Sequence, residues 1–266
     1  MSTEETKIYP SKCPVCGIHT NYVYRVAETK SGKTGTWFRC DCGVIFQSAT
    51  PDGGLYGKEY LKSYESESLR LRYTTACKTY APLIEKLTFG RQMLDVGYCI
   101  KDNMKEWEKR GWLTWGIDRN TAICEMGNIY KGDFLEYDFD IKVDKETLKT
   151  NTGLTETPHR EFDFIYMGDV LEHFTDPLAA LKKASVLLSG TGVLYISTPD
   201  IDFITKLGVP AFPFWRKDEH YVMWSERALK RELEKLGLKV IMCRRNFQAC
   251  FHTMHNLHLI AQKHYF

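Results

Sequence analysis

The chain has 266 residues, of which 43% are apolar and 26% are charged. These values are ordinary for a globular protein, and the length allows one large domain or one domain with a small module. The 36 Lys and Arg residues nearly balance the 34 Asp and Glu residues, which leaves a net charge of +2. A protein held mainly by phosphate contacts would carry a stronger basic excess, so composition disfavours nucleic acid as a partner.

The sequence contains neither a membrane-spanning run nor a secretory signal. No stretch approaches the roughly 18 apolar residues that a spanning helix needs. The N-terminal stretch MSTEETKIYP is polar and acidic, without a basic start or an apolar core. We therefore expect a cytoplasmic location and no membrane partner. In that compartment the nine cysteines stay reduced, so clustered cysteines indicate a metal site.

Four cysteines near the N-terminus have the spacing of such a site. KCPVCG supplies Cys13 and Cys16, FRCDCG supplies Cys40 and Cys42, and each pair is followed by a glycine. Four thiolates suit Zn²⁺, and four protein ligands make a closed, structural site. The second pair is one residue shorter than the usual C-x-x-C, and buried free thiols are the alternative. We expect a small zinc ribbon over residues 1–54 that packs on the next domain.

Residues 55–89 are expected to form a helical connector or lid. Tyr56, Tyr60 and Tyr64 are spaced four residues apart, so one helical face carries three phenols. Such a face can pack by its rings, or its hydroxyls can line a substrate mouth. The second alternative makes Tyr60 a candidate catalytic residue.

Short apolar runs alternate with helical periods through residues 90–266. Strands are expected at QMLDVG, LTWGID, FDFIYMGDV, GTGVLYISTP, LKVIMCRR and HNLHLIAQK, a strand end at KGDFLEY, and helices at NMKEWEKRGW, TAICEMGNIY, PLAALKKASVLL and SERALKRELEKLG. This alternation predicts an α/β fold with a parallel sheet covered on both faces. The two consecutive final strands predict an antiparallel edge hairpin. The polar residues 141–160 are interpreted as a surface insertion.

Acidic residues follow four successive predicted strands. Asp95 and Gly97 end the first strand, Asp118 ends the second, Asp133 follows the third, and Gly168 with Asp169 ends the fourth. Ligands of such sheets bind at the carboxyl ends of the strands. An acid after the second strand can accept both hydroxyls of a ribose. Asp133 could bind an adenine amino group, with Phe134 beside the ring.

With these features the sequence resembles the class I S-adenosylmethionine-dependent methyltransferases that carry an N-terminal zinc ribbon and modify sugars or polysaccharides. The resemblance is carried by CPVCG…CDCG, LDVG, WGID, GDF, DVLEH and EHY…SERAL. It implies a Rossmann-like, seven-stranded methyltransferase sheet with S-adenosyl-L-methionine and structural Zn²⁺ as cofactors. It also implies a small carbohydrate acceptor that is methylated on oxygen or carbon.

The resemblance assigns cofactor contacts to individual positions. The methionyl part would lie near Asp95 and Gly97, the ribose on Asp118, the adenine on Asp133 and Phe134, and the sulfonium near Met167, Gly168 and Asp169. The family loop is typically D-x-G-x-G-x-G, whereas Cys99 and Lys101 stand at its second and third glycines. Either Lys101 pairs with the cofactor carboxylate, or the pocket is occluded and the chain is an inactive scaffold.

Methyl transfer to a neutral hydroxyl or amine needs a base to remove a proton. By resemblance to sugar C-methyltransferases, His220 would be that base, oriented by Glu219; a hydrogen-bonding role at the entry of the next helix is the alternative. His173 follows the fourth strand, and the D-x-x-E-H spacing of Asp169, Glu172 and His173 also resembles the cation site of ubiquinone-type O-methyltransferases. Ordering the cofactor end of the pocket is the role we favour there.

Two further aromatic and histidine-rich segments have open interpretations. Phe212, Phe214, Trp215, Tyr221 and Trp224 could form an acceptor wall or could hold their loop in place. His252, His255 and His258 resemble a ligand array, but in a strand this spacing alternates between faces, which favours an edge-strand surface.

Overall fold

The computed structural model describes residues 11–28, 34–48, 67–99, 101–119, 128–139, 161–207, 219–245 and 256–264. Several expectations lie outside these ranges: those for Tyr56, Tyr60 and Tyr64, for Phe212, Phe214 and Trp215, for His252 and His255, and for the insertion at 141–160. Within the described residues, no helix is both long enough and apolar enough to cross a membrane.

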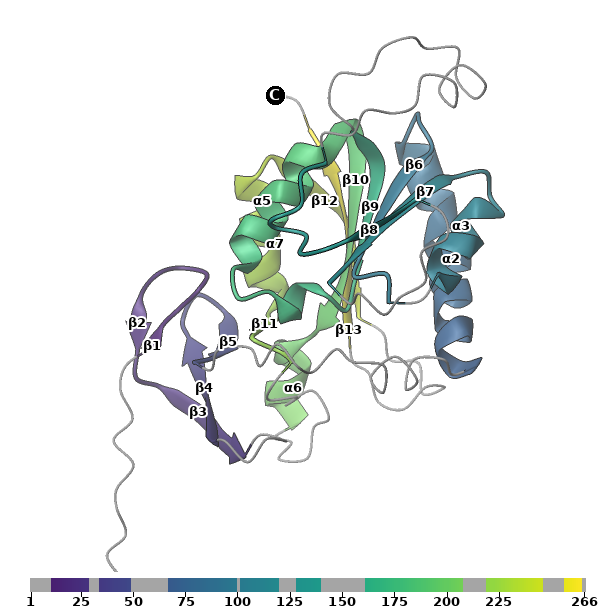
Figure 1. Cartoon of the computed structure of the whole chain (residues 1–266). Helices are drawn as coiled ribbons and strands as arrows, with labels where there is room; N and C mark the ends of the chain where they lie inside the picture. Colours follow the sequence, from purple (N-terminus) through teal and green to yellow (C-terminus); the bar gives the residue numbers. More distant parts are fainter. Residues whose placement is uncertain are drawn as a thin grey trace, which may run out of the picture.

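A seven-stranded sheet forms the centre of the molecule (Figure 1), with the strand order β12-β13-β10-β9-β6-β7-β8. Its strands are β6 (Gln92–Val96), β7 (Leu113–Asp118), β8 (Ile129–Lys131), β9 (Phe162–Gly168), β10 (Leu188–Pro199), β12 (Leu238–Arg245) and β13 (Asn256–Lys263). Strands β6 to β10 run parallel, and β13 pairs antiparallel with both β10 and β12. The expected α/β sheet with an antiparallel C-terminal hairpin is confirmed.

Helices cover both faces of this sheet. In Figure 1, α5 (Pro177–Leu187) and α7 (Glu226–Lys235) lie on one side, whereas α2 (Glu67–Leu87) and α3 (Asp102–Glu108) lie on the other. The 3₁₀ turn η1 (Leu171–His173) and helix α6 (Ile201–Leu207) follow the carboxyl ends of β9 and β10. Helix α2 agrees with the helical connector expected before residue 89, over the part of it that the structure describes.

The central strands alternate between two apolar cores, as a sheet buried on both faces requires. Ile165 and Met167 of β9 pack in the core on the α5 and α7 side. Their neighbours Phe164 and Tyr166 pack against residues of α2 and α3. Successive side chains of one strand therefore pack in opposite layers, and this explains why the run FIYM (164–167) is continuously apolar.

Two local expectations are wrong. Ile129 and Tyr130, which we assigned to the end of a helix, form β8 beside Ile117 and Asp118 because their backbone pairs with β7. Strand β13 is also not at the sheet edge, because β12 pairs with its outer side. His258 is consequently buried, and its Nδ1 lies 2.7 Å from the Tyr195 hydroxyl.

The N-terminal residues form a small second unit of strands. A hairpin of β1 (Ser11–Lys12) and β2 (His19–Thr20) precedes the antiparallel strands β3 (Val23–Glu28), β4 (Thr34–Cys40) and β5 (Val44–Gln47). Strand β11 (Val222–Trp224), from far along the chain, completes this sheet in the order β11-β5-β4-β3. The division into 1–54, 55–89 and 90–266 stays a prediction, and β11 links the first part to the last.

Candidate functional site

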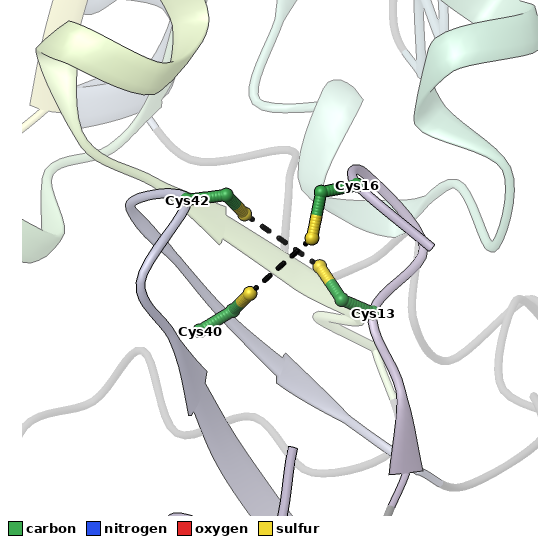
Figure 2. A group of neighbouring side chains, drawn as sticks. All are labelled: Cys13, Cys16, Cys40 and Cys42. Atoms are coloured by element: carbon green, nitrogen blue, oxygen red, sulfur yellow. Dashed lines mark hydrogen bonds between the residues drawn. The ribbon is translucent and has the colours of Figure 1, made fainter. Parts of the chain in front are cut away.

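The four N-terminal cysteines converge in the structure (Figure 2). Cys13 and Cys16 lie in the turn between β1 and β2, and Cys40 and Cys42 lie at the turn between β4 and β5. The sulfur atoms of Cys13 and Cys42 are 3.7 Å apart, and those of Cys16 and Cys40 are 3.4 Å apart. A tetrahedron with Zn–S bonds of about 2.3 Å has edges of about 3.8 Å, so the cluster fits one Zn²⁺ ion.

The second cysteine turn is held by helix α7. Gly43 adopts φ 97°, a left-handed conformation, and a Cβ atom there would lie 2.6 Å from the Ser225 hydroxyl oxygen. The Ser225 amide donates to the Gly43 carbonyl, and the Arg231 guanidinium donates to the Cys42 carbonyl at 3.0 Å. This close approach explains why the shorter C-x-C turn ends in glycine: no side chain fits between it and α7.

The loop after β6 lies close to the loop after β9. Gly97 adopts φ 72°, and a Cβ atom there would lie 2.7 Å from a methyl carbon of Val170. Cys99 also adopts a left-handed conformation, with φ 46°, which costs a residue other than glycine about 1–2 kcal/mol. The chain therefore keeps the turn of a glycine loop although Cys99 replaces the glycine.

Asp95, the first acid of this loop, is buried with 2% of its surface exposed. Its carboxylate accepts a 2.7 Å hydrogen bond from the side-chain amide of Asn103 in α3. Burial raises the pKa of Asp95 from 3.8 to about 8, and the nearby charge of Asp118 acts in the same direction. Asp95 therefore joins β6 to α3, and its buried position separates it from the surface-facing acids.

The acids after β7 and β8 lie beside this loop. One Asp118 carboxylate oxygen accepts the Cys99 amide at 3.1 Å, so the loop and the second strand end are bonded to each other. Asp133 accepts the Leu135 amide and lies 3.3 Å from the Arg119 side chain. Lys101 precedes α3 and makes no side-chain capping bond to it.

Phe134 lies in the apolar core on the α5 side of the sheet. Only 3% of its surface is exposed. Its ring packs near Phe139 and Phe174, and the Lys183 ammonium lies 5.6 Å from its centroid. The same Lys183 donates to the carbonyls of Leu135 and Tyr137, so it fixes the segment that follows Asp133.

Asp169 is the centre of a polar network at the carboxyl end of β9. Its carboxylate accepts hydrogen bonds from the Ser197 hydroxyl of β10 and from the Asn256 amide of β13. Its backbone is left-handed, with φ 54°. Met167 is fully buried, and a side chain at Gly168 would collide with the Tyr166 ring. Three strand ends thus fix one carboxylate in place.

A second cluster joins η1 to the segment before β11. The His173 and His220 rings meet edge to face with centroids 4.8 Å apart. Candidate ligand atoms of Glu172, His173 and His220 all lie within 4.8 Å of one another, so this trio could also hold a divalent metal. Thr198 donates to the Glu172 carboxylate at 3.0 Å. The alternative cation site of Asp169, Glu172 and His173 is not the group that the structure brings together: Asp169 is bonded to Ser197 and Asn256, and His220 lies with Glu172 and His173 instead.

The residues around His220 are buried, although they come from a segment expected to be a loop. Glu219, His220 and Tyr221 are at most 5% exposed, and Trp224 is fully buried. This burial agrees with the alternative in which Tyr221 and Trp224 hold the segment in place. The helix-entry role belongs to Ser225, whose hydroxyl accepts the Ala228 amide.

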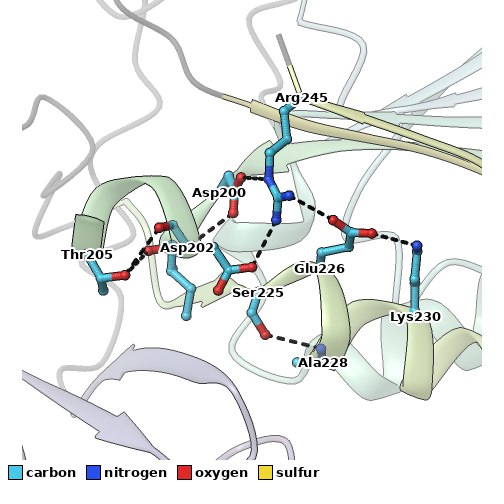
Figure 3. A network of polar contacts seen from close by, with 9 residues as sticks. Asp200, Asp202, Thr205, Ser225, Glu226, Ala228, Lys230 and Arg245 are labelled. Atoms are coloured by element: carbon cyan, nitrogen blue, oxygen red, sulfur yellow. Dashed lines mark hydrogen bonds and ion pairs between the residues drawn. The ribbon is translucent and has the colours of Figure 1, made fainter. Parts of the chain in front are cut away.

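An ionic cluster centred on Arg245 lies beside β11 (Figure 3). The Arg245 guanidinium of β12 contacts Asp200 after β10, Asp202 in α6 and Glu226 at the start of α7. Asp200 is 1% exposed and forms a parallel bridge with Trp224. Arg245 therefore connects β12 of the central sheet to residues that come before β11 in the chain (Asp200 and Asp202) and to one that comes after it (Glu226).

Comparison with known proteins identifies the family. A family model described as a methyltransferase domain matches residues 67–242, which is more than half of the chain. The chain belongs to the methyltransferase-domain family. The match begins where α2 begins and ends within β12, so it includes strands β6 to β10, helices α2, α3, α5 and α7, and the residues Asp169, Glu172, His173 and His220, whereas β13 with Asn256 lies beyond it.

Curated relatives match a shorter part of the chain. The ubiquinone biosynthesis O-methyltransferase of Histophilus somni is 33% identical over 110 residues, covering 41% of this chain and 44% of that protein. The enzyme of the same name from Haemophilus ducreyi is 31% identical over 112 residues, covering 41% and 46%. The chain thus matches less than half the length of these relatives.

Solved structures share the fold of the methyltransferase domain. A 1,6-didemethyltoxoflavin-N1-methyltransferase from Burkholderia thailandensis, solved with S-adenosylhomocysteine, has a TM-score of 0.55 at 13% identity and covers 90% of this chain and 99% of its own. The PH0226 protein of Pyrococcus horikoshii has a TM-score of 0.52 at 15% identity and covers 79% and 95%.

Four residues of the polar clusters were missed by the sequence reasoning, among them Thr198, which donates to the Glu172 carboxylate. Ser197 and Asn256 hold Asp169, and Gln47 donates to the His220 carbonyl at 2.7 Å. Ser197 lies in STPD at the end of a predicted strand, a position that could have been read as part of the site. Asn256 and Gln47 carried no signal, because their roles depend on long-range strand pairing.

Proposed function

We propose that this chain uses S-adenosyl-L-methionine to methylate a hydroxyl group of a small polar acceptor. The observation that carries the proposal is the convergence of His173 and His220 beside Glu172, close in the chain to the strand end that carries Asp169. Two imidazoles and a carboxylate at the carboxyl edge of a methyltransferase sheet supply a proton acceptor where acceptors of this fold bind.

In the proposed reaction, the acceptor oxygen forms a bond to the methyl carbon while the carbon–sulfur bond breaks and its electrons stay on sulfur. The hydroxyl proton passes to His220, with Glu219 as its orienting neighbour and His173 as the facing ring. Most of the rate enhancement would come from holding the oxygen in line with the methyl group. Tyr60, proposed to add a phenol to this site, lies outside the described residues.

The cofactor contacts are proposed along the same edge. Asp118 would hold the ribose, Asp133 and Phe134 the adenine end, and Met167, Gly168 and Asp169 the sulfonium end. Asp95, Gly97 and Lys101 would lie near the methionyl part. Asp118 accepts the Cys99 amide through one carboxylate oxygen, and this contact between the acid and the loop after β6 supports the assignment. When bound, the cofactor supplies the methyl group.

The experiment that tests this proposal compares two classes of acceptor. The zinc ribbon favours a sugar or nucleotide-sugar, whereas the names of the curated relatives favour the hydroxyl of a ubiquinone precursor. Methylation on carbon is the less supported variant, since both of these relatives are named O-methyltransferases.

We further propose that the four-cysteine cluster holds a structural Zn²⁺. The sulfur spacing supports this, and so does the absence of disulfides: seven cysteines are free among the described residues. Zinc thiolates need reduced cysteines, so a cytoplasmic location is the matching proposal.

A methyl-transfer screen tests the function. Protein with S-adenosyl-L-methionine carrying a labelled methyl group is incubated with nucleotide-sugars, free sugars and catechols, and the label is followed in the products. Labelled product from either class supports the proposal and chooses the acceptor. If neither cofactor nor S-adenosylhomocysteine changes the melting temperature of the chain, the scaffold alternative suggested by Cys99 and Lys101 replaces it.

A further inference from the structure

Strand β11 is part of the ribbon sheet and also bridges to the end of a strand in the central sheet. Val222, Met223 and Trp224 pair antiparallel with Phe46, Ile45 and Val44 of β5 in the ribbon. On the other side, Trp224 forms a parallel bridge with Asp200 at the end of β10. His220 lies two residues before this strand, so its backbone enters the junction between ribbon and methyltransferase domain.

Gln47, the last residue of β5, contacts that backbone twice. Its side-chain amide donates to the His220 carbonyl at 2.7 Å, and its backbone amide donates to the Tyr221 carbonyl at 2.9 Å. From the opposite direction, the Tyr221 amide donates to the Glu172 carbonyl at 2.6 Å. The peptide after His220 is therefore bonded on one side to the ribbon and on the other to η1, which carries His173.

The burial of Gln47 is not explained by packing alone. A glutamine is rarely buried, and a buried amide costs free energy unless it is bonded. Gln47 is 6% exposed, and its amide oxygen has no hydrogen-bond partner among the residues that the structure describes. An apolar side chain would avoid that cost, so the amide donor toward His220 is the feature that glutamine adds.

The ribbon itself is held close to the same junction. Strand β5 begins directly after the second cysteine turn, and that turn is bonded to Ser225 at the N-cap of α7 and to Arg231 in the middle of that helix. The apolar residues Phe38, Val44 and Phe46 share one core with Leu229 of α7 and Met167 of β9. Gln47 therefore reaches His220 from a rigid support.

We propose that Gln47 is a positioning residue for His220, and that the ribbon serves the site by fixing this histidine opposite His173. The proposal rests on the proposed function for its catalytic meaning, since it is there that His220 is the base. The positioning of His220 can be measured in the chain without acceptor or cofactor, so this proposal can be refuted separately from the proposed function.

The test compares Gln47→Met, which keeps the length but loses the donor, with Gln47→His, which returns a ring N–H at a similar reach. Gln262→Met is the matched control, because the Gln262 amide donates to the carbonyls of Leu87 and Thr191, away from the site. Two properties are measured without acceptor: the reaction rate of His220 with diethyl pyrocarbonate, located by peptide mass spectrometry, and hydrogen exchange of the Tyr221 amide.

We expect Gln47→Met to raise both rates by about tenfold or more, the size of effect that follows from losing one buried hydrogen bond. Gln47→His should restore most of the protection, and Gln262→Met should match the wild type. Exchange in β6 and β9 shows whether each variant is folded; if Gln47→Met is not, Gln47→Leu, which also has no donor, replaces it. Wild-type protection of His220 and Tyr221 in a folded donor-free variant overturns the proposal. If the wild type does not bind the cofactor, the proposed function is overturned instead.

Discussion

The imidazole rings of His173 and His220 lie edge to face with centroids 4.8 Å apart, although one follows β9 and the other precedes β11. The contact joins a turn of the parallel sheet to a segment that the ribbon holds through Gln47. Both rings lie beside the buried carboxylate of Glu172. The proposed acceptor side of the site is therefore assembled from two parts of the fold.

His220 should contribute to the chemical step and hardly to cofactor binding. We expect His220→Gln to lower turnover by roughly 10²–10⁴-fold, the usual contribution of a general base, while the affinity for S-adenosylhomocysteine changes little. Turnover is followed by release of S-adenosylhomocysteine with an acceptor found in the screen. His264→Gln serves as the control, because His264 follows β13 and its amide donates to the Gly237 carbonyl, away from His173 and His220. A fully active His220→Gln variant would exclude His220 as the base.

Asp95 should make the stability of the chain depend on pH. Its pKa is raised to about 8 mainly by burial, so the folded chain holds this proton more tightly than the unfolded chain does. The contribution of this proton to the free energy of unfolding is fully present below the unfolded pKa of about 4 and is lost as the pH rises through about 8.

Asp95→Asn cannot ionise and keeps an oxygen for the Asn103 amide. It should exceed the wild type by more than about 1 kcal/mol in unfolding free energy at pH 8, since one pKa unit corresponds to about 1.4 kcal/mol. The difference should narrow toward pH 5. Urea unfolding at both pH values measures it, and equal differences at the two values would contradict the assignment.

Cys99 should be strained by its left-handed backbone. Because glycine adopts φ 46° without steric cost, Cys99→Gly should be more stable than Cys99→Ala by about 1 kcal/mol. The alanine variant is the control, since both substitutions remove the thiol. Denaturant unfolding at one pH compares them. Equal stability, or a more stable alanine variant, would show that the loop does not require this conformation.

The cysteine cluster should bind about one zinc ion per chain. Metal content by mass spectrometry should fall to background in Cys16→Ser and in Cys42→Ser. Cys243→Ser should retain the metal, because this half-buried cysteine lies in β12, outside the cluster. Chelation of the wild type should also speed hydrogen exchange in β5 and β11, which share backbone bonds. Full metal content in both cluster variants would refute the site.

The sheet and the cysteine cluster were predictable because each leaves a local signal. Continuous apolar runs such as FIYM (164–167) indicate strands buried on both faces, and paired cysteines before glycines indicate metal turns. Strand β8 was misassigned because a run of three residues is too short to show whether it follows the period of a strand or of a helix. The edge position expected for His258 was wrong because the order of the final strands depends on pairing and not on chain order.

The polar site was predictable only in part, for a similar reason. Asp169, His173 and His220 carry motif-like spacing and could be named in advance. Their partners Ser197, Asn256 and Gln47 come from three other strands, and no local pattern marks an isolated polar residue that will face a distant loop. The pairing of β11 with the ribbon could not be predicted either, because the short run VMW pairs with a strand that lies far away in the chain.

Calorimetric titration of S-adenosylhomocysteine into the wild type and into Asp118→Asn tests the central claim most directly. Asn keeps one oxygen for the Cys99 amide but loses the charge and the second acceptor oxygen, so the loop should stay in place while the ribose loses its partner. We predict saturable binding to the wild type and at least a tenfold weaker association with the variant, about 1.4 kcal/mol. No binding to the wild type, or equal affinity for the two proteins, would contradict a cofactor site at these strand ends.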